Sequence, residues 1–148
     1  QIRYLINSPA DYLCAIRFSA AAWKVGPRDS WIGWSAERRV QNLHLVVDNS
    51  RFLILPWVQC KHLASKILSL CVKRLPIDWQ EVYGYKPVLL GTFVDKERFA
   101  GTCYRAANWI HVGSTQGRGK LDRLHEYKLP VKDIYLYPLN KNFRIFLV

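Results

Sequence analysis

The residues with the most distinctive chemistry lie between Thr92 and Gly119. Tyr104, in the segment YRAANW, carries a hydroxyl that can act as a general acid if a departing group lies within hydrogen-bond reach. The stretch that follows, STQGRGKLDRLHEYKLPVK, is rich in glycine, arginine and lysine. Glycines let a backbone approach a phosphate closely, and the arginine fork matches phosphate oxygens. This window predicts a reaction centre or a phosphate contact, and the alternative is a tyrosine packed in the core beside a solvated basic loop.

The whole chain carries an excess of positive charge. Its 148 residues include 22 Lys and Arg against 11 Asp and Glu, a net charge of +11. Such an excess favours an anionic partner such as nucleic acid, a phosphate-bearing cofactor or an acidic surface. Zinc-finger, ribonucleoprotein and helix-turn-helix patterns are not visible, so base-specific recognition is not predicted. We predict contact with the phosphate backbone of nucleic acid, made by Arg51, Arg105, Arg118, Lys120 and Arg123.

Cysteine usage and hydropathy argue against several classes of protein. The four cysteines (Cys14, Cys60, Cys71 and Cys103) lack paired spacing, which suits reduced, buried thiols better than a disulfide framework. Cys60 and His62 lie close together without a second ligand pair, so we predict no metal site. No apolar run is long enough to span a bilayer, and the start lacks a signal-peptide pattern. We therefore expect a cytoplasmic protein with no membrane partner.

Strands that alternate with helices are predicted to position these residues. Half of the chain is hydrophobic, which is enough to build a core. The pattern predicts one α/β domain over residues 1–148, arranged around a mixed sheet. The segment RFLILPWV is typical of a strand buried on both faces, and Pro56 within it indicates a bulge or an edge.

The boundaries of the other elements follow from periodicity and breaking residues. We expect SAAAW, residues 19–23, to form a tight turn or a helix. A helix capped by Ser35 should continue through Val46–Val47, and a second helix should run from Leu63 and end before Pro76. A short helix is expected within residues 96–108. Strands are predicted over residues 2–6, 51–58, 87–95, 109–115 and 132–139.

Several long segments resemble the DruA-like family. They are NSRFLILPWV, LASKILSL, DWQEVYGYKPVLLGTFVD, RFAGTCYRAANWIHVGSTQGRG and KDIYLYPL, and the match extends over essentially the whole chain. The family takes its name from the Druantia anti-phage system, and its members accompany transposase-like genes. The resemblance implies a setting in phage defence or mobile elements, with protein partners from a defence or transposition system. It also implies that a further N-terminal region precedes Gln1.

The order of elements from Arg51 to Thr115 is similar to the core of the GNAT (Gcn5-related N-acetyltransferase) fold. In that superfamily a strand ends in a bulge, and a glycine-rich turn opens the next helix. The backbone amides of this turn hold the pyrophosphate of coenzyme A, because helix N-termini favour anions. The resemblance implies an acyl-CoA cofactor, with its phosphates at Gln59, His62, Ala64 and Ser65.

The same resemblance implies a reaction. Tyr104 stands where a tyrosine of the superfamily protonates the leaving thiolate, with Asn108 in place of the glycine that follows. His62 replaces a glycine that lets backbone and phosphate approach closely. Gly91 stands where members of the family usually have Glu. Because His62 and Gly91 count against conventional acyl transfer, we favour a nucleic-acid-engaging accessory module, with a GNAT-type N-acyltransferase as the alternative.

Overall fold

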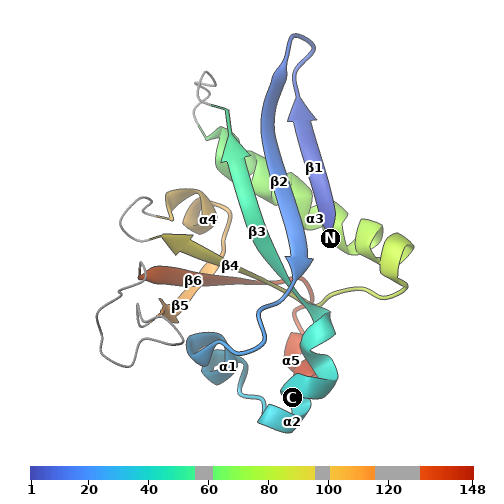
Figure 1. Cartoon of the computed structure of the whole chain (residues 1–148), viewed down its shortest axis with the longest axis vertical. Coiled ribbons are helices and arrows are strands. Elements are labelled where there is room, and N and C mark those ends of the chain that lie inside the picture. The colour runs from blue at the N-terminus through green and yellow to red at the C-terminus, as the bar shows by residue number, and fades with distance from the viewer. Residues whose placement is uncertain (56–61, 96–100, 116–130) are drawn as a thin grey trace, which may run out of the picture.

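A mixed β-sheet forms the centre of the structure. The computed structural model describes residues 1–55, 62–95, 101–115 and 131–148. Within these ranges, six strands lie in the order β1-β2-β3-β4-β6-β5. Strands β3 and β4 are parallel, and the other neighbouring pairs are antiparallel. The strands are β1 (Ile2–Asn7), β2 (Tyr12–Ala20), β3 (Val46–Ile54), β4 (Leu89–Asp95), β5 (Ile110–Ser114) and β6 (Lys132–Pro138), as Figure 1 shows.

One face of the sheet, which we call the α3 face, is covered by the long helix α3 (Leu63–Tyr83) and the short helix α4 (Thr102–Ala106). Phe18, Leu68 and Leu90 are fully buried in the core between these helices and the strands. The buried residues of α3 recur every three or four positions, which places them on one side of the helix. None of the helices in the described ranges is long and apolar enough to cross a bilayer.

The opposite face is covered near β4 and β6 by α1 (Gly26–Ile32) and α5 (Phe143–Leu147). Leu89 and Leu147 are fully buried in this second core. Helix α2 (Ala36–Asn42) contributes no buried residue and packs beside α5. In Figure 1, α1, α2 and α5 lie together at one end of the molecule, while β1, β2 and the far part of β3 extend away from them.

The helix predicted after Ser35 ends earlier than expected. Ser35 caps α2, because its hydroxyl accepts a hydrogen bond from Arg38 N at 3.1 Å. The prediction that the helix continues through Val46–Val47 is wrong, since a 3₁₀ turn over Leu43–Leu45 leads directly into β3. Val46 and Val47 are buried in the cores on opposite faces of the sheet. A strand achieves this by alternation, and β-branched side chains suit strands.

Two other predicted boundaries are also wrong. Ser19 and Ala20 extend β2 instead of forming a turn or a helix. The predicted strand over residues 51–58 begins earlier, at Val46, and its exposed part contradicts burial on both faces: Leu53 is 57% exposed. Residues 56–58 lie outside the described ranges.

Helix α3 continues through Pro76, where the sequence predicted its end. A proline inside a helix removes a hydrogen bond and costs about 3 kcal/mol. Leu75 and Trp79, on either side of it, are 0% and 4% exposed, and their burial offsets that cost. The helix ends instead at Tyr83, and Gly84, which follows it with a φ of 85°, closes the last turn.

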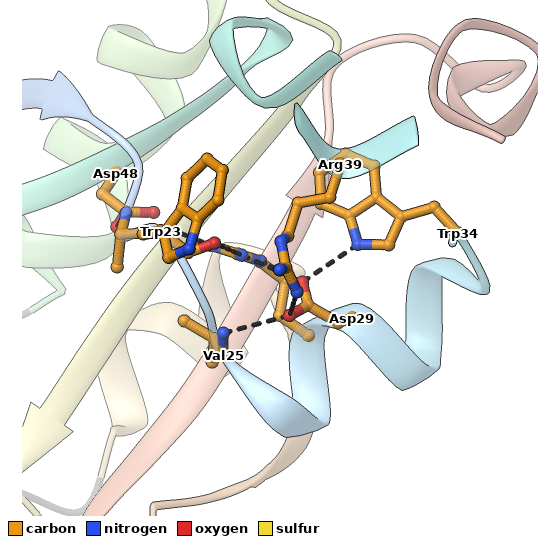
Figure 2. A network of polar contacts seen from close by, with 8 residues as sticks. Trp23, Val25, Asp29, Trp34, Arg39 and Asp48 are labelled. Carbon is orange, nitrogen blue, oxygen red and sulfur yellow. Dashed lines mark hydrogen bonds and ion pairs between the residues drawn. The ribbon is translucent and has the colours of Figure 1, made fainter. Parts of the chain in front are cut away.

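A polar network fastens α1 to the segments around it (Figure 2). Arg28 is only 2% exposed, and its Nη1 donates to Ala22 O at 2.6 Å. Its charge is balanced by Asp29, whose Oδ1 lies 2.9 Å from Arg28 Nη2. The Asp29 carboxylate also accepts hydrogen bonds from Val25 N, Trp34 Nε1 and Arg39 Nη1.

We predict that Asp29→Ala lowers the free energy of unfolding by about 3–5 kcal/mol, because it leaves the Arg28 guanidinium buried without its ion-pair partner. Urea denaturation followed by tryptophan fluorescence measures this change. Glu81→Ala, on the exposed side of α3, is the control and should stay within about 0.5 kcal/mol of the parent chain. Equal stabilities of the two variants would show that the network does not hold α1 in place.

Candidate functional site

The candidate site is a cleft that opens where β3 and β4 separate. The two parallel strands pair only from Val46 opposite Leu89 to Asn49 opposite Thr92. Beyond these pairs, β3 stays with β2 and β4 stays with β6. The cleft between them has a volume of about 810 Å³ and is also lined by residues of α4 and by Ala64 of α3. Figure 1 shows β3 and β4 leaving each other at a wide angle.

A bulge in β3 lies at the point of separation. Arg17 of β2 is opposite Arg51, and Phe18 is opposite Asn49, so that Ser50 is an extra residue in β3. The Asn49 side chain is buried, and its Nδ2 donates to the main-chain oxygens of Arg17 and Arg51, both at 3.0 Å. These bonds satisfy two carbonyl groups beside the irregular ladder. The bulge at Ser50 lies within β3, which continues to Ile54. Pro56, where the sequence predicted a bulge or an edge, lies outside the described ranges.

Tyr104 meets Asn49 from α4. Its hydroxyl donates to Asn49 Oδ1 at 2.5 Å, and Thr92 Oγ1 lies 3.4 Å from the same hydroxyl. The Thr92 hydroxyl also reaches Asn49 O at 3.0 Å. Tyr104 is only 7% exposed and lines the cleft, where its ring stacks on Tyr135. Burial raises the pKa of the Tyr104 phenol above its usual value, although the bond with Thr92 acts in the opposite direction. The phenol therefore keeps its proton at neutral pH.

Cys103, beside Tyr104, also lines the cleft. Burial raises the pKa of its thiol, and hydrogen bonds to backbone groups only partly oppose that effect. A thiol that stays protonated is a poor nucleophile. The side chain is therefore part of the cleft wall and is not an activated group.

Three of the four residues predicted at the cofactor phosphates lie together at the start of α3. His62, Ala64 and Ser65 line a smaller cavity of about 290 Å³, and Ala64 also lines the main cleft. The Ser65 hydroxyl donates to His62 O at 3.1 Å, and within the described part of the chain no side chain caps the helix. The first amide groups of α3 therefore carry the partial positive charge of a helix N-terminus. The fourth residue, Gln59, lies outside the described ranges.

The two positions where glycine was expected adopt the conformation that glycine favours. His62 has φ 63° and Asn108 has φ 69°. Few residues other than glycine adopt positive φ, and Asn and His are among those that do so more often. The backbone at His62 thus has the shape that a glycine would give it, with an imidazole added.

Gly91 lies on the face opposite α3, against the buried side chain of Asp48. A Cβ atom at Gly91 would lie 2.8 Å from Asp48 Oδ1. Asp48 Oδ2 accepts a hydrogen bond from Ala22 N at 3.1 Å, and burial raises the pKa of the carboxyl despite this bond and the nearby charge of Arg28. The space for a side chain at this position is therefore filled by a carboxylate from the neighbouring strand.

The structure describes two of the five basic residues predicted to contact nucleic acid. Arg51 is exposed and lines the cleft. Arg105 is exposed on α4, with its guanidinium 5.9 Å from the centre of the Tyr135 ring. The other three, Arg118, Lys120 and Arg123, lie outside the described ranges. Sequence reasoning did not identify Asn49 and Thr92, because only the strand register brings them to Tyr104.

Solved structures similar to this chain are acetyltransferases. An N-acetyltransferase from Staphylococcus aureus Mu50 matches with a TM-score of 0.59 at 13% identity, covering 93% of this chain and 67% of its own. A GNAT-family acetyltransferase from Bacillus cereus ATCC 10987 has a TM-score of 0.54 at 9% identity, with coverages of 92% and 69%. The protein yncA from Salmonella typhimurium, described as an acetyltransferase with its cofactor acetyl-CoA, has a TM-score of 0.55 at 11% identity. That match covers 88% of this chain and 60% of yncA. These identities establish the fold alone, and they confirm the predicted GNAT-like α/β fold.

The sequence comparison is more specific. The family described as Druantia protein DruA matches residues 1–126, and the chain belongs to this family. The predicted resemblance is thereby confirmed. No curated protein matches the chain at a significant level.

We predict that Tyr104→Phe lowers the free energy of unfolding by about 1–3 kcal/mol, because it leaves the buried oxygen of Asn49 without its donor. Urea denaturation measures the change. Tyr12→Phe is the matched control, because Tyr12 is 57% exposed and should tolerate the loss of a hydroxyl with little change. If the two variants are equally stable, the Tyr104 hydroxyl does not hold Asn49 in the bulge.

Proposed function

We propose that the chain binds an acyl-CoA cofactor in the cleft between β3 and β4 and transfers its acyl group to an amine. The separation of these parallel strands supports the proposal, because it opens a cleft of about 810 Å³ beside the N-terminus of a long helix. A helix N-terminus favours the phosphates of such a cofactor. The cleft is also large enough for a cofactor of this kind.

The two departures from the superfamily pattern weigh less against this proposal once their surroundings are known. His62 has the left-handed backbone conformation of the glycine that it replaces. Gly91 faces Asp48 and is not among the residues that line the cleft. A missing side chain at Gly91 therefore removes nothing from the cleft wall.

Acyl-CoA, when bound, supplies an acyl thioester that an amine can attack. The contribution of the chain itself is the proton on the Tyr104 hydroxyl, which now points to Asn49 Oδ1. A thiol has a pKa of about 8.5, whereas burial raises the pKa of Tyr104 above its usual range. Tyr104 is thus a weaker acid than a thiol. We therefore propose that the Tyr104 hydroxyl donates a hydrogen bond to the negative charge that develops on the departing sulfur, and that it does not give up its proton completely.

Binding can be tested by thermal denaturation with CoA and acetyl-CoA. A ligand at 100 times its Kd should stabilise the native chain by about 2.7 kcal/mol. Ser65→Asp should weaken this effect by repelling the cofactor phosphates, yet it should leave the free chain as stable as before, because an acidic residue suits the first turn of a helix. Ser69→Asp, one turn further along α3, is the matched control. A parent chain that neither CoA nor acetyl-CoA stabilises would refute the proposal.

The charge distribution favours a second function, the binding of nucleic-acid phosphates through a basic surface. The chain has a net charge of +11, and Arg51 is exposed with no carboxylate within ion-pair distance among the described residues. We place Arg51 and Arg105 in this surface, together with the predicted Arg118, Lys120 and Arg123. A setting in phage defence or mobile DNA, with protein partners from such a system, accords with membership of the DruA family.

We predict that the chain binds a labelled DNA duplex, and that log K falls with log salt concentration by about 0.9 for each phosphate contacted. Fluorescence anisotropy with duplex and single-stranded DNA, at about 50 and about 200 mM salt, measures the affinity and the slope. Arg105→Gln should reduce the salt slope for duplex DNA by about 0.9, the value for one phosphate contact. Binding that is absent at the lower salt concentration would rule out this second function.

A further inference from the structure

Among the described residues, strands β1, β2 and the far part of β3 are covered on the α3 face only. Tyr4, Ile16 and Phe52 pack toward α3, and the residues between them in each strand point the other way. Two of those residues, Leu5 and Leu53, are 67% and 57% exposed. In Figure 1, α1, α2 and α5 lie away from this part of the sheet. We call this uncovered surface of β1, β2 and β3 the open face.

Three arginines form a row across the open face. Arg3 of β1 is directly opposite Arg17 of β2, and Arg17 is directly opposite Arg51 of β3. Residues in direct register point to the same side of a sheet, and neighbouring strands lie about 4.8 Å apart. We call these residues the arginine row, and it spans about 10 Å. The neighbouring positions Leu5, Ala15 and Leu53 form an apolar row beside it.

The arginine row has no counter-charge in the described structure. Like charges directly opposite each other destabilise a sheet. The ion pairs between described residues are made by Asp29, Asp78 and Asp133, and none of them includes an arginine of the row. The hydrogen bond found for a side chain of the row is from Arg17 Nε to Ser50 Oγ, at 3.0 Å. Repulsion within the row is therefore not offset by an acidic group of the described chain.

We infer that the arginine row is the docking site for the phosphate backbone of nucleic acid. This inference rests on the second proposed function and adds Arg3 and Arg17, beside Arg51, to the residues assigned to phosphate contact. Planar guanidinium groups match phosphate oxygens in pairs, which a row of lysines would not do. A nucleic-acid strand carries one negative charge per nucleotide, so a row about 10 Å long can meet more than one phosphate at once. A polyanion supplies the repeated negative charge that the row lacks.

One end of the arginine row lies at the cleft. Ser50 and Arg51 line the cleft, and Arg51 is also the last member of the row. Leu53 and Phe52 point to opposite faces of the sheet, yet both line the cleft. The cleft therefore reaches the open face. A strand of nucleic acid held by the row passes its mouth on the side away from α3.

The test compares the triple variant Arg3→Gln, Arg17→Gln, Arg51→Gln with a control of equal charge, Lys73→Gln, Lys86→Gln, Lys141→Gln, whose lysines are exposed outside the open face. Anisotropy is measured with labelled duplex and single-stranded DNA across a salt series. The row variant should reduce the duplex salt slope by about 2.7, the value for three phosphate contacts. The control should keep the parent slope. Thermal denaturation should give the row variant a midpoint equal to or above that of the parent, because repulsion is relieved.

The outcomes separate this inference from the function on which it rests. If the parent chain binds no nucleic acid, the second proposed function fails. If the parent binds and the row variant keeps its slope, or if both triple variants lose slope equally, nucleic-acid binding stands and the arginine row is not its site. The last measurement is the binding of the parent and the row variant to vesicles of phosphatidylserine in phosphatidylcholine. If the row variant loses vesicle binding but keeps DNA binding, the row docks on a lipid surface and the inference is overturned.

Discussion

The amide of Asn49 is the contact on which the shape of the sheet depends. Strand β3 leaves its parallel partner β4 at this residue and stays paired with β2. Such a departure leaves main-chain groups beside an irregular ladder, and Asn49 Nδ2 satisfies two of them, on Arg17 and Arg51. Its Oδ1 accepts the hydroxyl of Tyr104, which joins α4 to the same point. One buried side chain thus connects the bulge, the cleft and the short helix in the cleft wall.

The two faces of the sheet are stabilised in different ways. The α3 face is held by continuous apolar packing from Phe18 to Trp79. The opposite face combines a smaller apolar core with buried charges, in which Arg28 and Asp29 hold α1 and Asp48 fills the space at Gly91. That second layer ends before β1 and β2. The cleft consequently borders a helix N-terminus on one side of the sheet and the open face on the other.

The proposed cofactor site and the arginine row lie on different sides of this cleft. The cofactor proposal places phosphates at His62, Ala64 and Ser65, on the α3 side. The arginine row lies on the open face and meets the cleft at Arg51. An anion on one side is therefore separated from an anion on the other by the thickness of the sheet.

Local pattern was enough to predict much of this protein. Strand-like segments of the sequence predicted β4, β5 and β6 to within two residues at each end, and the helical period predicted the start of α3 at Leu63. Longer segments were enough to place the chain in its family. Tertiary structure decided the rest. Val46 and Val47 became strand because each meets a different core, and α3 passes Pro76 because Leu75 and Trp79 are buried. Asn49 meets Tyr104 across 55 residues of chain, and Arg3, Arg17 and Arg51 align only through strand register. Propensity and periodicity act over a few neighbouring residues, whereas register and burial depend on contacts between segments far apart in the sequence.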